Sequence, residues 1–154
     1  MEKNLVLVSG AVIFKEKGGK LRWFIIENSK GGWEIPKVVV RKGESSVRAA
    51  LRMTGEKGGM STRVLEEIAR TGGVTTINGR ALPQRHIYYL MRLKFSANEV
   101  IGFENYLWLE NAKAIKKITS KREKLVFKDA KKLLAKLKKE REIRNIRNQP
   151  DFYA

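Results

Sequence analysis

Residues 33–60 read WEIPKVVVRKGESSVRAALRMTGEKGGM, and this stretch decides the fold that we predict. The run Gly43-Glu44-Ser45-Ser46 is typical of a helix start, and Gly58-Gly59 ends the helix. Between them, apolar residues at i, i+3, i+4 and i+7 make one helix face: Val47, Ala50, Leu51 and Thr54. Before the helix, residues 38–40 (VVV) favour a short strand.

Strands are predicted on both sides of this helix. Upstream, residues 5–14 and 21–27 are rich in branched aliphatic residues and flank a turn at residues 16–19 (EKGG). Downstream, residues 64–70, 74–78 and 86–95 favour strands, and Asn78-Gly79 is a strong signal for a tight turn. Strands arranged around an internal helix indicate an α/β domain.

The last third of the chain predicts one more strand and two helices. Residues 106–109 (YLWL) form the strand, and a helix follows at about residues 110–118. A long helix then begins near Ser120, with an apolar stripe made of Val126, Ala130, Leu133 and Leu137. Beyond Leu137 only Ile143 and Ile146 interrupt the polar residues. We therefore expect one domain over residues 1–137 and an extension of the last helix over residues 138–154.

The charge of the chain is strongly positive and unevenly spread. Against 16 Asp and Glu there are 33 Lys and Arg, which gives a formal net charge of +17 over 154 residues. Residues 111–148 hold 15 of these cations and 4 acidic residues, a surplus of 11. Such a surplus repels itself and attracts polyanions. Nucleic acid is the partner this favours, and an anionic membrane surface is the weaker alternative.

Other features of the composition narrow the class of protein. The chain has no cysteine, which excludes disulfides, thiolate metal sites and a cysteine nucleophile. No apolar run approaches the ~18 residues of a membrane helix. We expect a soluble, cytoplasmic protein without a membrane partner.

The order of several short motifs resembles the Nudix hydrolase family, most closely the small diadenosine-tetraphosphate hydrolases. Residues 33–37 (WEIPK) match the family's lead-in, and residues 43–45 (GES) and 49–52 (AALR) match two parts of its box. Downstream, Glu104 lies four residues before Trp108, and residues 108–118 (WLENAKAIKKI) match the family's following helix. The resemblance implies an α/β/α sandwich with a central mixed sheet, here ending in a long basic helix.

The box departs from the family at the positions that bind metal. Its leading glycine is Val38, and two of the three clustered glutamates are Met53 and Lys57, which leaves Glu56. In the family these carboxylates hold Mg²⁺ on one helix face, and a thioether or an ammonium cannot replace them. We therefore expect a degenerate Nudix domain without a cofactor. The resemblance also implies that Arg52 holds the box loop by hydrogen bonds. We expect Trp33 to be a structural residue as well.

Three interpretations of function remain open. The first is a non-catalytic Nudix-fold protein that binds RNA or a ribonucleoprotein particle such as a ribosome, with the groove free for a nucleotide. The second is a divergent pyrophosphohydrolase of nucleoside polyphosphates or RNA 5′ ends, in which Glu44, Glu56 and Glu104 hold Mg²⁺ and Glu56 and Glu44 act in catalysis. The third is a protein-interaction scaffold. The alternative for Glu56 is a surface ion pair with Lys57, Arg52 or Arg48. The alternative for Glu44, in the first turn of the helix, is a structural role in which its charge complements the helix macrodipole.

Under the first interpretation the nucleic-acid contacts are phosphate contacts made by the C-terminal cations. These are Lys116, Lys117, Lys121, Arg122, Lys128, Lys131, Lys132, Lys138, Lys139, Arg141, Arg144 and Arg147. Trp23, Tyr88 and Tyr89 are weaker candidates for stacking on a base, since their spacing is that of core residues. His86, the single histidine, is expected to be a half-buried strand residue.

Overall fold

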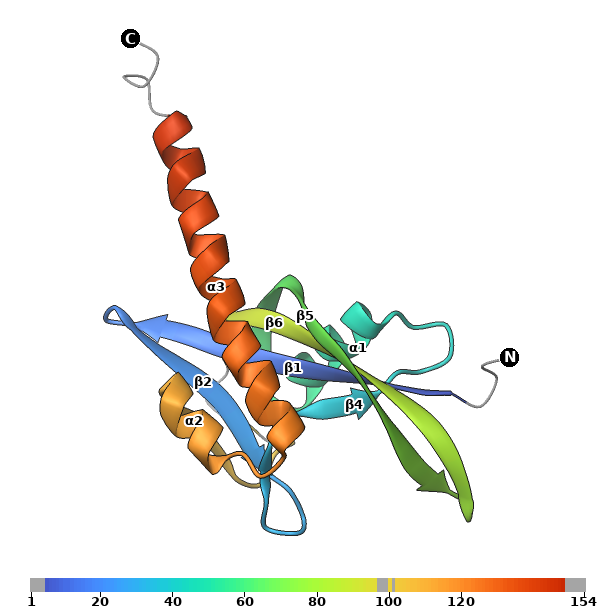
Figure 1. Cartoon of the computed structure of the whole chain (residues 1–154). Helices are drawn as coiled ribbons and strands as arrows, with labels where there is room; N and C mark the ends of the chain where they lie inside the picture. Colours follow the sequence, from blue (N-terminus) through green and yellow to red (C-terminus); the bar gives the residue numbers. More distant parts are fainter. Residues whose placement is uncertain (1–4, 97–99, 101, 149–154) are drawn as a thin grey trace.

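The computed structural model describes residues 5–96, 100 and 102–148. Seven strands and three helices occur in this part of the chain (Figure 1). The strands are β1 (Val6–Lys17), β2 (Lys20–Glu27), β3 (Trp33–Glu34), β4 (Lys37–Val39), β5 (Met60–Ile77), β6 (Arg80–Ser96) and β7 (Tyr106–Leu109). The helices are α1 (Ser46–Glu56), α2 (Asn111–Lys117) and α3 (Lys121–Arg147).

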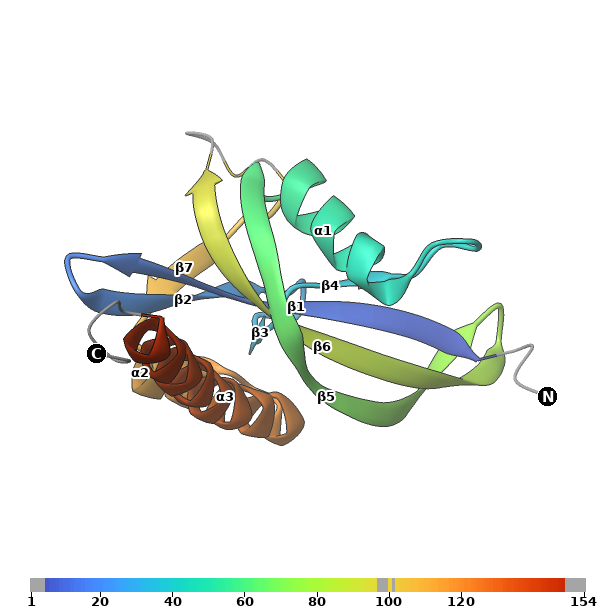
Figure 2. The ribbon, with the colours of Figure 1, turned by 90° about the horizontal axis from the view of Figure 1, so that it is seen from above.

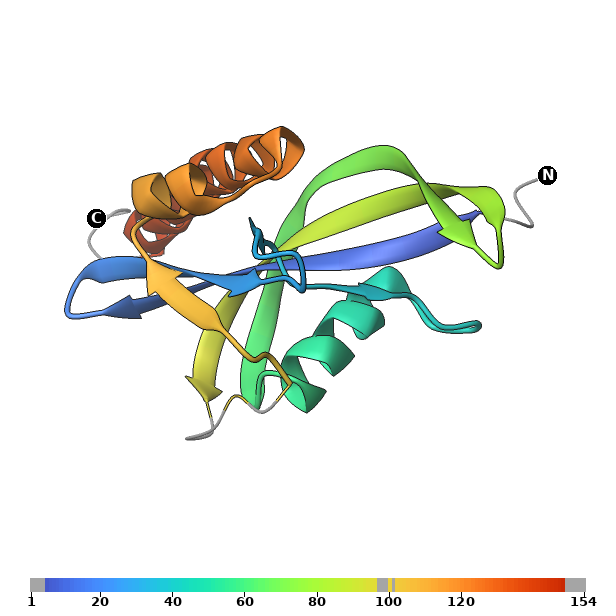
Figure 3. The same cartoon turned by 90° about the horizontal axis from the view of Figure 1, so that it is seen from below.

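The strands form one mixed sheet, as predicted. Its order is β3-β2-β1-β6-β5, with β4 paired to β1 and β7 paired to β2. β1 and β6 run parallel, and the other pairs are antiparallel. α1 covers one face of the sheet and α2 and α3 cover the other, which Figures 2 and 3 show from opposite sides. The expected α/β/α sandwich with a long basic C-terminal helix is confirmed.

Two hydrophobic cores lie on the two faces of the sheet. Alternate residues of β1 point to opposite faces, so Val12 and Phe14 join the core under α2 and α3, while Ala11 and Ile13 join the core under α1. Trp23, Tyr88 and Tyr89 belong to these cores and are at most 6% exposed. The suggestion that one of them stacks on a base is therefore wrong, because their rings are packed inside the domain.

The long β5–β6 hairpin differs in one respect from the prediction. Asn78 and Gly79 form the expected turn, with φ values of 52° and 76°. However, the two strands predicted at residues 64–70 and 74–78 are a single strand, β5. Gly72 and Gly73 do not interrupt it, because both stay paired in register with Arg85 and Gln84 of β6.

The helices begin where the sequence predicts, but α1 is rotated relative to its predicted face. Ser45 caps α1 by accepting a hydrogen bond from the Arg48 backbone N–H. The buried residues of α1 are Ala49, Ala50, Met53 and Thr54, whereas Leu51 is 38% exposed. Of the predicted face, Ala50 and Thr54 are buried, and Ala49 and Met53 take the place of Leu51 in the core.

The two ends of α3 have different surroundings. Val126, Phe127, Ala130 and Leu134 are buried against the sheet, and the predicted stripe residues Leu133 and Leu137 pack at the margin of the same core. From residue 138 to residue 148 every side chain is exposed. The distal half of α3 therefore projects beyond the domain (Figure 1). Within the described residues, no helix is long and apolar enough to span a membrane.

Candidate functional site

The loop before α1 is held by an ion pair between Glu44 and Arg52. Arg52 donates from Nε and from a terminal nitrogen to the two carboxylate oxygens, at 2.8 and 3.0 Å, and also reaches the Val39 carbonyl at 3.3 Å. The Arg41 backbone N–H donates to the same carboxylate at 3.1 Å. These bonds, chiefly those from Arg52, lower the pKa of Glu44 from 4.5 to about 2. The Glu44 oxygens are thus engaged by donors within the protein.

The other positions of the box do not form a carboxylate cluster. Met53 is 1% exposed and packs in the core under α1, so it does not share an open face with Glu56 and Lys57. Lys57 is the C-terminal cap of α1, and both it and Glu56 are exposed. The hydrogen bond to Glu44 is the main cause that raises the pKa of Arg52, and the charge of Glu56 adds to it.

The segment that carries Glu104 passes the C-terminal end of α1. The Gly102 backbone N–H donates to the Lys57 carbonyl at 2.8 Å. A Cβ atom at residue 102 would lie only 2.4 Å from the Cβ atom of Lys57, so the approach requires glycine. Glu104 itself is exposed.

These residues do not fit a Mg²⁺ site. Hard cations need several oxygen ligands converging on one point. Among the described residues, no group of three or more His, Asp or Glu side chains is placed to hold a metal ion. In addition, Glu44 is bonded to Arg52, and an exposed ammonium stands at Lys57.

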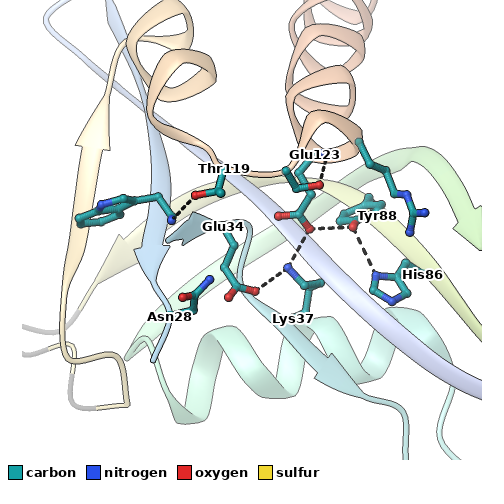
Figure 4. A pocket seen from close by; sticks show the side chains of 10 residues that line it. Asn28, Glu34, Lys37, His86, Tyr88, Thr119 and Glu123 are labelled. Atoms are coloured by element: carbon teal, nitrogen blue, oxygen red, sulfur yellow. Dashed lines mark hydrogen bonds and ion pairs between the residues drawn. The ribbon is translucent and has the colours of Figure 1, made fainter. Parts of the chain in front are cut away.

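A polar pocket of about 320 Å³ lies on the other face of the sheet, between the sheet and the start of α3 (Figure 4). We call it the polar pocket. It is lined by Asn28, Trp33, Glu34, Lys37, His86, Tyr88, Thr119, Ser120, Arg122 and Glu123. Three strands (β3, β4 and β6), the β2–β3 loop, the α2–α3 loop and the first turn of α3 supply these residues, so residues far apart in sequence meet here.

Glu123 is the centre of the polar pocket, although its carboxylate is almost fully buried. One oxygen accepts from the Ile35 backbone N–H at 2.9 Å. The other accepts from the Tyr88 hydroxyl and from the Lys37 ammonium, each at 2.7 Å. Lys37 also bonds Glu34 at 2.7 Å and the Ile35 carbonyl at 2.7 Å. The buried charges of Glu123 and Lys37 are therefore compensated within the protein.

Two further groups of the polar pocket have shifted pKa values. Burial, followed by the nearby charge of Glu123, raises the pKa of Tyr88 far above its usual range, so its hydroxyl remains a donor. Burial, followed by the charge of Lys37, lowers the pKa of His86 below its usual range. His86 is half-buried, as predicted, and its ring nitrogens lie 2.7 Å from Gln84 Oε1 and 3.4 Å from the Tyr88 hydroxyl.

The pairing of Glu123 with Lys37 was not predicted from the sequence. A signal was present, because Ser120 and Glu123 have the spacing of a capping box, S-x-x-E. Ser120 does cap α3, accepting from the Glu123 backbone N–H at 3.3 Å. The Glu123 carboxylate instead crosses to residues 35 and 37, and the sequence alone cannot indicate a contact over so long a separation.

Trp33, in β3, contacts the loop between α2 and α3 and the end of α2. Its backbone N–H donates to the Thr119 hydroxyl at 3.0 Å, and its carbonyl accepts from the Thr119 backbone N–H at 3.1 Å. The Lys117 ammonium lies 5.2 Å from the centre of its ring. Trp33 thus fixes the loop that enters α3.

The predicted nucleic-acid-binding cations are all exposed. Lys116 and Lys117 lie on α2, and the remaining ten lie on α3. Of these twelve cations, only Lys138 forms an ion pair with another described residue: its ammonium lies 2.6 Å from the Glu16 carboxylate of β1. Arg122 lines the polar pocket. The structure therefore spreads these cations along two helices on one side of the sheet.

Comparisons with known proteins agree with this architecture. No family model matches the sequence, and no curated protein matches it either. Among solved structures, the C. elegans Ap4A hydrolase has a TM-score of 0.66 and 23% identity, over 84% of this chain and 98% of that one. The Nudix domain of Shewanella oneidensis NrtR, complexed with ADP ribose, has a TM-score of 0.65 and 17% identity, over 86% and 90%.

A third solved structure extends the agreement. The Nudix hydrolase from Nitrosomonas europaea has a TM-score of 0.64 and 15% identity, over 80% of this chain and 86% of that one. Each of the three matches covers at least 80% of this chain. By its structure, this chain has the Nudix fold.

Proposed function

We propose that this protein binds RNA, alone or in a ribonucleoprotein particle such as a ribosome, through the cations of α3, and that its Nudix-fold domain is a non-catalytic scaffold. The observation that carries the proposal is the projecting half of α3. Residues 138–147 carry five cations and two carboxylates, and all of their side chains are exposed. A ten-residue helix is marginal in water. The projecting half therefore depends for its helical form on residues 121–137, the seated half of α3, which packs against the sheet.

The chemistry of this segment suits a phosphate backbone better than an apolar partner. The exposed cations of α3 supply phosphate contacts, which give affinity through counterion release and carry little sequence information. Ile143 and Ile146 are exposed but isolated among charged residues, so they do not form an apolar patch. A cytoplasmic location fits this role and is part of the same proposal.

The scaffold role is supported by the state of the box. Glu44 is bonded to Arg52, Met53 lies in the core, and Lys57 places a cation where a metal ligand would be required. A Nudix-type hydrolase needs a metal to polarise the pyrophosphate and activate water. A nucleotide in the Nudix groove is compatible with this scaffold role, since the Nudix domain of NrtR is complexed with ADP ribose.

The decisive experiment compares two triple variants with equal loss of charge. The first is Arg141→Gln, Arg144→Gln and Arg147→Gln on the projecting half. The control is Lys30→Gln, Lys42→Gln and Lys94→Gln, three exposed cations elsewhere on the domain. Affinity for two unrelated single-stranded RNAs is measured by fluorescence anisotropy between 50 and 300 mM salt, a range in which counterion release is easily resolved.

The α3 variant should lose affinity equally for both RNAs. Its plot of log affinity against log salt should flatten by about 0.7 for each phosphate group that the helix no longer neutralises. The control should weaken much less. If the two triple variants weaken binding by the same amount, the effect is one of net charge, and α3 is not the RNA-binding element.

A further inference from the structure

The β1–β2 hairpin carries a basic pocket on the sheet face that α1 covers, opposite to α3. Lys15, Lys17, Lys20, Arg22 and Trp108 line a volume of about 290 Å³, and we call this the hairpin pocket. Four of its five lining residues are cations. Figure 2 shows the hairpin at one end of the sheet, with β7 beside it.

The register of the two strands places like charges directly opposite each other. Lys15 pairs with Arg22, and Lys17 pairs with Lys20. Directly opposed like charges destabilise a strand pair. The intervening residue Glu16 points to the other face, where it bonds Lys138 of α3 at 2.6 Å, so it does not neutralise this cluster. The hairpin therefore holds two repulsive pairs side by side on one face.

Lys15 is held at the base of the cluster. Its ammonium lies 4.3 Å from the centre of the Trp108 ring, and that ring packs against Phe24 with ring centres 5.0 Å apart. Burial lowers the pKa of Lys15, and Lys17 and Arg22 lower it further. These repulsions would be relieved by an anion placed between the cations.

The nearby carboxylate of Glu110 is too distant and too exposed to neutralise these cations. Glu110 lies 3.9 Å from Arg22, and its side chain is 56% exposed. An exposed pair at that distance contributes little. Arg22 also donates to the Leu21 carbonyl at 3.0 Å, which orients its guanidinium. Even with Glu110 counted, the cluster keeps a surplus of positive charge.

We propose that the hairpin pocket binds a phosphate group. Lys15 is the fixed ammonium at its base, and Lys17, Lys20 and Arg22 close around the anion from the two strands. Lysine ammoniums bind phosphate as point charges, and arginine adds a forked donor. The phosphate comes either from the backbone of a nucleic acid or from a small phosphorylated molecule. This site does not depend on RNA binding by α3, because it lies on the opposite face of the hairpin.

The test follows the Trp108 indole N–H signal of the full-length, isotope-labelled protein by NMR. The probes are inorganic pyrophosphate and a short single-stranded RNA, each added at constant ionic strength against a chloride control. We expect a saturable shift of the Trp108 signal with at least one probe. The signal of Trp23, whose ring is buried on the other face, should not move.

A charge-matched pair of variants tests the assignment. Lys15→Gln with Lys17→Gln should weaken phosphate binding at least about tenfold, because it removes two charge-assisted hydrogen bonds. Lys42→Gln with Lys94→Gln removes the same charge from exposed positions elsewhere and should change binding less than about twofold. Without phosphate, the hairpin variant should unfold at the same temperature as the wild type or higher, because it is relieved of repulsion.

The outcomes separate the two sources of phosphate. Saturation by pyrophosphate without hairpin-dependent RNA binding indicates a small phosphorylated ligand. RNA binding that pyrophosphate displaces, and that persists in the Arg141→Gln, Arg144→Gln, Arg147→Gln variant, indicates a backbone phosphate held independently of α3. The proposal is overturned if neither probe moves the Trp108 signal, or if both charge-matched variants weaken binding equally.

Discussion

Glu123 connects three segments through a single carboxylate. It accepts hydrogen bonds from the Ile35 backbone, from Lys37 and from Tyr88, and almost none of its surface is exposed. Removing this carboxylate takes away the acceptor of the Ile35 N–H and of the Tyr88 hydroxyl and leaves Lys37 with Glu34 as its one ion-pair partner among the described residues. The start of α3, the β3–β4 segment and β6 are thus joined at one residue.

We predict that Glu123→Ala lowers the free energy of unfolding by about 3 kcal/mol, because the Lys37 charge and the Tyr88 hydroxyl lose a buried acceptor. Glu123→Gln should cost less, since the amide oxygen can still accept from the Ile35 N–H. Urea denaturation measures both. Glu140→Ala, at an exposed position of α3, is the control and should stay within about 0.5 kcal/mol. Equal effects of the two alanine variants would contradict this role of Glu123.

The Glu44–Arg52 pair makes part of the stability depend on pH. The folded protein lowers the pKa of Glu44 from 4.5 to about 2. A lowered carboxyl pKa gives stability that is present above pH 4.5 and is lost as the pH falls through about 2. In an Arg52→Gln variant the pKa of Glu44 should return toward 4.5, because its main cause is removed.

The melting temperatures of the wild type and of Arg52→Gln should therefore converge as the pH falls from about 5 to about 2. Thermal unfolding followed by circular dichroism measures this difference at each pH. A gap that stays constant over the whole range would mean that Arg52 stabilises the protein by packing and by its bond to the Val39 carbonyl, not by its charge on Glu44.

At the scale of elements, α3 combines a seated half with a projecting half. A truncation after Leu137 removes residues 138–148 of the described chain, and all of their side chains are exposed. Its ion pair with the domain, Lys138–Glu16, is itself exposed at 45% and 37% of the two side chains, and such pairs contribute about 0–1 kcal/mol. The division of the chain at residue 137 thus leads to a direct prediction.

The truncated protein should keep its free energy of unfolding to within about 1 kcal/mol, while its helical circular dichroism decreases. In contrast, Leu134→Ala, in the seated half, should cost about 2–5 kcal/mol because Leu134 is buried. Urea denaturation compares the two. A truncation that destabilises the protein as much as Leu134→Ala would place the domain boundary further along the helix.

The elements also show what local sequence can and cannot predict. The Asn78-Gly79 turn, the start of α3 near Ser120 and the approximate bounds of α2 depend on neighbouring residues, and the sequence predicted all three. The continuity of β5 through Gly72-Gly73 depends on pairing with β6, and the buried face of α1 depends on the sheet beneath it. Neither could be predicted from sequence spacing alone. The polar pocket was missed for the same reason, since Glu123 and Lys37 meet only through the fold.

For the whole molecule, we predict no Mg²⁺-dependent hydrolysis of diadenosine tetraphosphate or nucleoside triphosphates. Removing the ligands that assemble the metal should remove several orders of magnitude in rate. Phosphate release is measured with Mg²⁺ and with Mn²⁺, and metal binding by calorimetry. Turnover of about one per second that Glu56→Gln abolishes would contradict the scaffold role and support the divergent hydrolase.

The continuity of α3 has a mechanical consequence. Its 27 residues contain neither glycine nor proline, so the helix is a stiff rod of about 40 Å. The seated half packs this helix against the sheet, and the exposed Glu16–Lys138 pair lies where the helix leaves the domain. Whatever grips the free end also fixes the tilt of the sheet, because a clamped rod transmits torque as well as tension. A partner that binds the last three turns of α3 would therefore also set the orientation of the whole domain.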